Sequence, residues 1–171
     1  HKAKENEEWY HSVEKLSKEN NIATFFYEKE NDLMTEKVKE LNPDLILSVG
    51  YRNKIPSEIL NIPAKGAINV HGSLLPKYKG GAVLNWAIIN GENKIGISIF
   101  YLDKEVDSGN IIKKNYIDIL ENDDIASVIE KVKEKYIDMF RGLLSNLKSI
   151  KSISQKGEIT YTSKRRPEDG M

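Results

Sequence analysis

Residues 67–81 read AINVHGSLLPKYKGG, and the rest of the chain can be understood outward from this stretch. Its first four residues form a largely apolar run of strand type, and a histidine follows directly. Residues two apart on an extended strand share a face, so Asn69 and His71 point the same way. Pro76 and the glycines at 72, 80 and 81 then indicate a shaped loop. The stretch therefore predicts a polar pair at the end of a strand, followed by an ordered turn.

On both sides of this stretch, apolar runs of strand length alternate with patterns of helical period. Helices are expected at residues 5–20, 32–41, 56–61, 82–91 and 123–147, and strands at 22–27, 44–51, 67–70, 94–102, 110–119 and, briefly, 158–163. Asp32 is the expected N-cap of the second helix, and Asp123 or Asp124 that of the longest one. Such alternation predicts an α/β fold with a mainly parallel sheet, with the strand at 44–51 buried on both faces. Ligands of such sheets bind beyond the carboxyl ends of the strands.

The composition narrows the class of protein. The 171 residues are enough for one domain with a hydrophobic core. Absence of cysteine excludes disulfides, zinc thiolate sites and cysteine nucleophiles, and is in keeping with a cytoplasmic location. Lys+Arg and Asp+Glu both number 26, so the zero net charge argues against a general nucleic-acid surface. No apolar run reaches the roughly 20 residues of a membrane span.

Several familiar site motifs are absent from the sequence. It contains no dinucleotide fingerprint, no P-loop and no nucleophile elbow. The stretch DKEVDSG at 103–109 resembles a calcium loop only faintly. Its glycine falls one place too late, and Lys114 stands where a bidentate glutamate is needed. We therefore expect no metal site.

The remaining candidates for chemistry are Asn69, His71 and Asp107. A histidine can take a proton from a nucleophile and return it to a leaving group near neutral pH. The Asn69 amide can donate to a developing oxyanion, and Asp107, in a turn after the neighbouring strand, can orient the imidazole. Because the set lacks a covalent nucleophile, it suits acyl transfer between two bound substrates, one of which supplies an amine.

Two segments taken together, INVHGSLLPKYKGG (68–81) and GISIFYLDKEVDSGNII (96–112), resemble the formyltransferases that use 10-formyltetrahydrofolate. The shared pattern is N-x-H-x-S-L-L-P, followed by D-x-G after a strand. The resemblance implies a Rossmann-like core over residues 1–150, without its opening βαβ unit, and a C-terminal extension or linker starting at 151–171. It also implies a cis Leu75–Pro76 bond.

The same resemblance implies roles for single residues. Asn69 would stabilise the oxyanion, His71 would transfer the proton, and Asp107 would favour the protonated imidazole and order water. Two further segments would bind the folate, and they consist of Asn53, Lys54 and Ile55, and of Asp103, Lys104, Glu105 and Val106.

The acceptor expected from the loop at 71–92 and from RRPEDG near the C-terminus is a nucleotide-linked amino sugar, with dTDP or UDP as the nucleotide. Relatives of that kind serve lipopolysaccharide biosynthesis. Three alternatives stay open: a methionyl-tRNA formyltransferase, a formyltetrahydrofolate deformylase with water as acceptor, and an inactive α/β ligand-binding module. No membrane partner is expected, nucleic acid is disfavoured by the zero net charge, and a homodimer stays open.

Overall fold

The computed structural model describes residues 12–27, 32–51 and 53–166, and the chain forms two compact units, residues 1–41 and 42–171. The first unit contains α1 (Val13–Glu19) and α2 (Asp32–Leu41). α1 confirms the later part of the helix expected at 5–20, whose earlier part lies outside the described residues. α2 confirms the helix at 32–41, with Asp32 as its first helical residue rather than its N-cap.

The strand expected at residues 22–27 is wrong, because this run has no regular secondary structure. Phe26 is 71% exposed and Ile22 61% exposed. The Phe25 ring instead lies 4.8 Å from the Lys37 ammonium. This is a cation–π contact within the first unit. An apolar run becomes a strand only where a neighbouring strand pairs with it, and none does here among the described residues.

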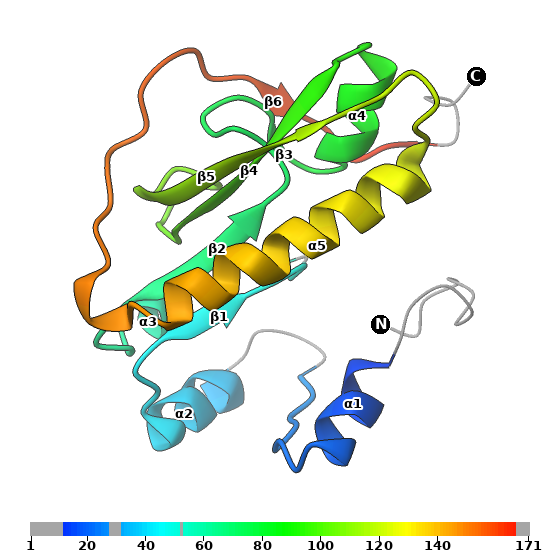
Figure 1. Cartoon of the computed structure of the whole chain (residues 1–171). Coiled ribbons are helices and arrows are strands. Elements are labelled where there is room, and N and C mark those ends of the chain that lie inside the picture. The colour runs from blue at the N-terminus through cyan, green and yellow to red at the C-terminus, as the bar shows by residue number, and fades with distance from the viewer. Residues whose placement is uncertain (1–11, 28–31, 52, 167–171) are drawn as a thin grey trace. The chain divides into compact units, whose positions relative to one another are not determined.

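The second unit is built around a four-stranded sheet in the order β1-β2-β4-β5 (Figure 1). Its strands are β1 (Ile46–Ser48), β2 (Ala67–His71), β4 (Lys94–Tyr101) and β5 (Ile111–Asp118). β1 and β2 are parallel, whereas β2–β4 and β4–β5 are antiparallel. The α/β class is confirmed, but the expected mainly parallel sheet is wrong for the described strands. A short loop joins β4 directly to β5, and such a connection requires antiparallel neighbours.

β1 also differs from the prediction of a strand buried on both faces. It spans three residues rather than eight, and Leu47 is 42% exposed. Of the three residues, Ser48 alone is buried. An apolar run of this kind does not reveal by itself how many of its residues find a pairing partner.

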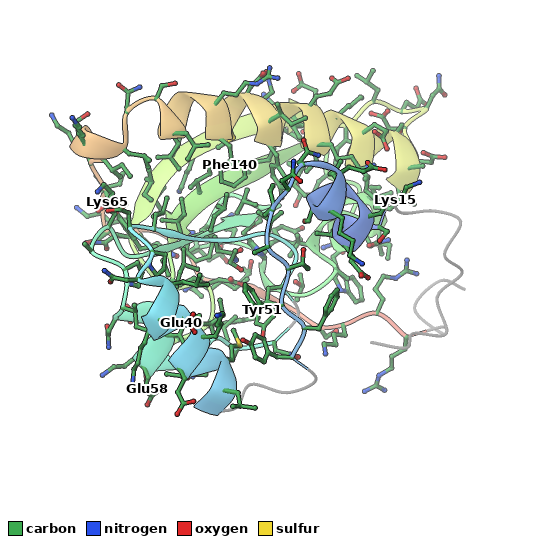
Figure 2. The ribbon with its side chains drawn as sticks, turned by 90° about the horizontal axis from the view of Figure 1, so that it is seen from below. Lys15, Glu40, Tyr51, Glu58, Lys65 and Phe140 are labelled. Atoms are coloured by element: carbon green, nitrogen blue, oxygen red, sulfur yellow. The ribbon has the colours of Figure 1, made fainter. Side chains whose placement is uncertain are left out.

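Three helices accompany the sheet: α3 (Ser57–Leu60), α4 (Val83–Ile89) and α5 (Ile125–Leu144), with a 3₁₀ turn, η2, at Leu147–Ser149. α5 runs along one face of the sheet (Figure 1), and Figure 2 shows Phe140 between this helix and the strands. The core combines the inner face of α5 with the strand interiors, and its fully buried members include Ile68, Ile97, Ile99, Val128 and Met139. The helical stripe read from residues 123–147 is thereby confirmed.

A capping box fixes the start of α5. The Asp124 carboxylate accepts a hydrogen bond from Ser127 N at 2.8 Å, and Ser127 Oγ accepts one from Asp124 N at 3.0 Å. Of the two expected caps, Asp124 is therefore the N-cap. Asp123 has a separate role, because it accepts hydrogen bonds from the Lys131 ammonium, from Leu120 N and from Ser127 Oγ. These bonds, that of Lys131 foremost, lower the pKa of Asp123 from 3.8 to about 2.

Asp123→Asn is expected to reduce the dependence of stability on acid pH. A carboxyl group whose pKa is lower in the folded state contributes stability above its unfolded pKa of 3.8 and loses it as the pH falls toward about 2. Urea unfolding between about pH 2 and 6 should show a shallower acid slope in the variant than in the wild type. Asp118→Asn is the matched control, because the Asp118 carboxylate only pairs with Lys94 on the surface. Equal acid slopes of stability in all three proteins would contradict the lowered pKa of Asp123.

A second sheet has two strands, and one of them lies in the loop that follows His71. β3 (Lys79–Gly80) pairs in parallel with β6 (Tyr161–Thr162), which confirms the short β-segment expected at 158–163. An isolated bridge also joins Ile111 to Ile153. Contacts thus run across the boundary expected at residue 150.

Candidate active site

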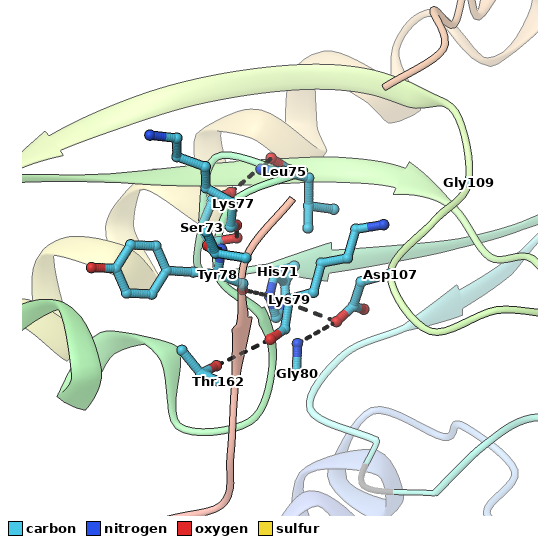
Figure 3. Close-up of polar contacts among 12 residues, drawn as sticks. His71, Ser73, Leu75, Lys77, Tyr78, Lys79, Gly80, Asp107, Gly109 and Thr162 are labelled. Atoms are coloured by element: carbon cyan, nitrogen blue, oxygen red, sulfur yellow. Dashed lines mark hydrogen bonds and ion pairs between the residues drawn. The ribbon is translucent and has the colours of Figure 1, made fainter. Parts of the chain in front are cut away.

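β2 and the loop after β4 bring the histidine and the aspartate together. His71 ends β2 beside Ser98 of β4, and Asp107 follows the end of β4. The His71 Nε2 atom lies 3.8 Å from Asp107 Oδ2 (Figure 3). Both residues are buried, with exposed fractions of 9% and 8%. Because both side chains are shielded from water, an electrostatic interaction between a protonated imidazole and this carboxylate would be stronger than at the surface.

The His71 ring is held by a backbone carbonyl. Its Nε2 atom lies 2.7 Å from Tyr78 O, a shorter contact than the one to Asp107. A carbonyl oxygen only accepts, so Nε2 carries the hydrogen in this contact. The neutral ring then keeps its lone pair on Nδ1, which is the atom able to take up a proton.

The turn that carries Asp107 is tightly constrained. Asp107 itself has a φ of 52°. This value lies in the left-handed region, which residues with a side chain seldom adopt. The Asp107 Oδ2 atom accepts a hydrogen bond from Gly80 N at 2.9 Å. At Gly109, an added Cβ would lie 1.8 Å from Tyr101 O, so only glycine fits. Glycine at position 109 is therefore a conformational requirement of the turn.

The loop after His71 is ordered by hydrogen bonds to β4. Ser98 Oγ donates to Ser73 O at 2.7 Å and accepts from Leu75 N at 3.1 Å, and all three residues are buried. Ser73 Oγ donates to Lys77 O at 2.7 Å. The Leu75–Pro76 bond is cis, as the resemblance implied. The shaped loop predicted from proline and glycine is thus confirmed.

Asn69 occupies the expected position on the strand. It pairs in register with Phe100 of β4 and with Ser48 of β1. It lies two residues before His71, on the same face of β2. It is half-buried, and within the described part of the chain no hydrogen-bond partner occupies its side-chain amide.

The two segments expected to bind folate lie differently with respect to these residues. Residues 103–106 are exposed and lead directly into Asp107, so the chain itself places them beside the site. Residues 53–55 follow β1, whose parallel pairing with β2 aligns Ser48 with Asn69. β1 thus ends on the side of the sheet that carries His71, whereas β4 ends opposite Ile68, at the other end of β2. Of the seven residues, Asn53, Lys54, Asp103, Lys104, Glu105 and Val106 are exposed, and Ile55 is half-buried. Their contacts with a ligand stay predictions.

Lys79 is a further charged residue near His71 and Asp107. It is only 4% exposed, and Figure 3 shows its side chain beside those of His71 and Asp107. A cavity of about 470 Å³ lies elsewhere, lined by Ile111, Lys114, Ile153, Ser154 and Lys156. It does not include the three expected catalytic residues.

Within residues 12–27, 32–51 and 53–166, no group of three or more acidic or histidine side chains is placed to hold a metal ion. Over the same part of the chain, no helix is both long and apolar enough to cross a bilayer.

The sequence of the chain matches a known protein family. The family model described as formyl transferase matches residues 2–141. The chain belongs to the formyl transferase family. This match spans β2, β4 and the Asp107 turn, which are the elements that carry the candidate site.

Among curated formyl transferases, two methionyl-tRNA formyltransferases are similar to the chain. The protein from Caldanaerobacter subterraneus subsp. tengcongensis is 42% identical over 136 residues, which cover 78% of this chain and 44% of that protein. The protein from Clostridioides difficile is 47% identical over 111 residues, which cover 64% of this chain and 36% of that protein. The chain thus spans less than half the length of the curated relatives it matches.

Solved formyl transferases share the fold. A methionyl-tRNA formyltransferase from Clostridium thermocellum matches with a TM-score of 0.69 and 31% identity, covering 91% of this chain and 67% of that one. A formyltransferase from Anoxybacillus kamchatkensis, in complex with UDP-4,6-dideoxy-4-formamido-L-AltNAc and tetrahydrofolate, matches with a TM-score of 0.68 and 25% identity. Its match covers 86% of this chain and 77% of that one. The Rossmann-like formyltransferase core is thereby confirmed.

Proposed function

We propose that the protein transfers a formyl group from 10-formyltetrahydrofolate to the amine of a second substrate. The observation that carries this proposal is the buried contact of 3.8 Å between His71 and Asp107. Asn69 lies on the same face of β2 as His71. Membership of the formyl transferase family supports formyltetrahydrofolate as the donor.

The chemistry needs one proton to move and one negative charge to be stabilised. The amine nitrogen attacks the formyl carbon, and the carbonyl oxygen becomes an oxyanion. The Asn69 amide donates to this oxyanion, an interaction that strengthens as the charge develops. His71 takes the proton from the attacking nitrogen and returns one to N10 of the folate as the C–N10 bond breaks. The products are the formamide and tetrahydrofolate, and Asp107 stabilises the imidazolium between the two transfers.

Bound water is the competing acceptor in such a site. Holding the amine against the formyl carbon favours transfer, since positioning two reactants can contribute about 7–11 kcal/mol. We propose that residues 53–55 and 103–106 hold the folate, because β1 ends on the side of the sheet that carries His71 and residues 103–106 lead directly into Asp107.

Two acceptors have specific support. Methionyl-tRNA is favoured by the curated relatives, which are 42% and 47% identical. A nucleotide-linked amino sugar is favoured by the sequence of the loop at 71–92 and by the solved relative that carries a UDP-linked formamido sugar. The first has the higher sequence identity, whereas the second agrees with the zero net charge of the chain.

The acceptor is decided by supplying each candidate to the purified protein with 10-formyltetrahydrofolate. We expect mass spectrometry to detect a formyl group on the methionyl-tRNA or on a dTDP- or UDP-linked amino sugar, with His71→Ala as the inactive control. Formate released at the same rate without any acceptor would show a deformylase. Binding of the folate without turnover under all conditions would show a binding module, and either result would overturn the proposal.

A further inference from the structure

Residues 153–163 cross both loops of the candidate site. At one end, Ile153 and Ile111 exchange backbone hydrogen bonds of 2.8 and 2.9 Å. At the other end, Tyr78 N donates to Thr160 Oγ1 at 2.8 Å, and Lys79 N donates to Thr160 O at 2.8 Å. We call residues 153–163 the clasp. It contacts the loop that follows His71 and the strand that follows the Asp107 turn.

Gln155 is the clasp residue that reaches the Asp107 turn itself. Its Nε2 atom donates to Asp107 O at 2.9 Å and to Gly109 O at 2.8 Å. Both partners are carbonyl oxygens, so the orientation of the side-chain amide is fixed: its NH₂ group must face the turn. The Oε1 atom is buried and meets no donor among the described residues. The amide is therefore held by its NH₂ group alone.

These two hydrogen bonds act on a strained backbone. Asp107 is in the left-handed region. That conformation is unfavourable for a residue other than glycine and persists only where the surroundings enforce it. Gln155 holds the carbonyls on both sides of Ser108, whereas Gly80 N holds the Asp107 carboxylate. The turn is thus fixed at its backbone by Gln155 and at its side chain by Gly80.

We propose that Gln155 is a positioning residue for the reaction: its amide holds the Asp107–Gly109 turn so that the carboxylate faces both His71 and Gly80 N. The inference rests on the proposed formyl transfer. Gln155 contacts no reacting atom and acts through Asp107, because Asp107 is the residue that meets the imidazole.

Gln155→Glu is the sharpest test, because glutamate has almost the same shape but its ionised carboxylate cannot donate a hydrogen bond. It would turn two hydrogen bonds into contacts between acceptors and displace the turn. We expect kcat to fall by about 10–100-fold, since a displacement of about 1 Å can cost a factor of that size. Glu158→Gln is the matched control, because Glu158 lies on the clasp but only pairs with exposed Lys77. It should retain wild-type kcat within about twofold.

A positioning role is separated from a merely structural one by combining Gln155→Glu with Asp107→Ala. If Gln155 acts through Asp107, its replacement should change kcat by less than about threefold once the carboxylate is gone. If the loss of kcat in the double variant equals the product of the losses in the two single variants, the proposal is overturned. Wild-type kcat in Gln155→Glu would overturn it as well. Should that variant fail to fold, Gln155→Ala replaces it in the same cycle.

A measurement without substrate keeps this inference separate from the proposed function. Hydrogen exchange of the Gly80 amide, followed by NMR, reports on its bond to Asp107. Exchange should accelerate about tenfold or more in Gln155→Glu and in Asp107→Ala, and stay unchanged in Glu158→Gln. Unchanged protection in Gln155→Glu would overturn the positioning role even in an active enzyme. Absence of formyl transfer by the wild type would overturn the proposed function alone.

Discussion

His71→Ala is expected to reduce formyl transfer by about 10²–10⁴-fold, the range that a positioned acid–base group supplies. The variant removes the only imidazole near Asp107 in the described part of the chain. Histidine is the side chain whose ordinary pKa lets it take up and return a proton near neutral pH. Single-turnover formylation, followed by mass spectrometry of the acceptor, measures the chemical step directly. Wild-type turnover in this variant would contradict the proposed mechanism.

The stability of the same variant must be followed, because His71 also holds Tyr78 O. Leaving this carbonyl without its donor should cost about 1–3 kcal/mol, less than the whole stability of a typical domain. His71→Gln is the matched control, since a glutamine amide can donate a hydrogen bond but cannot transfer the proton. We expect it to unfold at a higher urea concentration than His71→Ala and to stay equally inactive.

Gly109→Ala is expected to destabilise the protein strongly and to abolish transfer together. The added Cβ would lie 1.8 Å from Tyr101 O and 2.8 Å from Tyr101 C, and both are backbone atoms. Tyr101 cannot move freely, because its N donates to Asn110 O at 2.9 Å and the next residue, Leu102, donates to Ala67 O at 2.8 Å. We therefore expect a loss of about 3 kcal/mol, at the upper end of overpacking effects, or more.

The matched control for this substitution is Gly142→Ala in α5. There the added Cβ would meet only the flexible Lys113 Nζ, at 3.3 Å. Alanine inside a helix should stabilise by about 0.5–1 kcal/mol relative to glycine. Urea unfolding of both variants compares them directly, and equal effects would show that the Asp107 turn tolerates a side chain.

Much of the site could be predicted because its constraints are local in the sequence. The alternation of side chains along a strand places Asn69 and His71 on one face, and the glycine of the DSG sequence indicates a turn. α5 could be predicted from its apolar stripe and its acidic cap, and the structure confirms both features. These elements depend on residues that are close together along the chain.

The wrong expectations concern partners that are distant along the chain. Residues 22–27 are as apolar as a strand, yet no strand pairs with them among the described residues. The direction of β4 relative to β2 is a property of the connection between them, which the hydrophobic pattern of either strand does not encode. The alternation of helices and strands therefore indicated the class correctly and the strand directions wrongly.

The missed residues act through hydrogen bonds that leave no motif. Tyr78 contacts His71 by its carbonyl oxygen, an atom that every residue possesses. Gln155 reaches Asp107 from 48 positions away, inside a polar segment that resembled a linker. No spacing rule joins such positions, so only coordinates reveal them.

The parallel pairing of β3 with β6 has a consequence for biosynthesis. Tyr78 bonds to Thr160, 82 positions later, and Lys79 O accepts from Thr162, 83 positions later. Contacts so remote in sequence form late, because the intervening chain must first be ordered. During translation, the sheet that carries the histidine can leave the ribosome well before Thr160 and Thr162 do. The contacts of Tyr78 and Lys79 with this segment therefore form only after Thr160 and Thr162 have emerged.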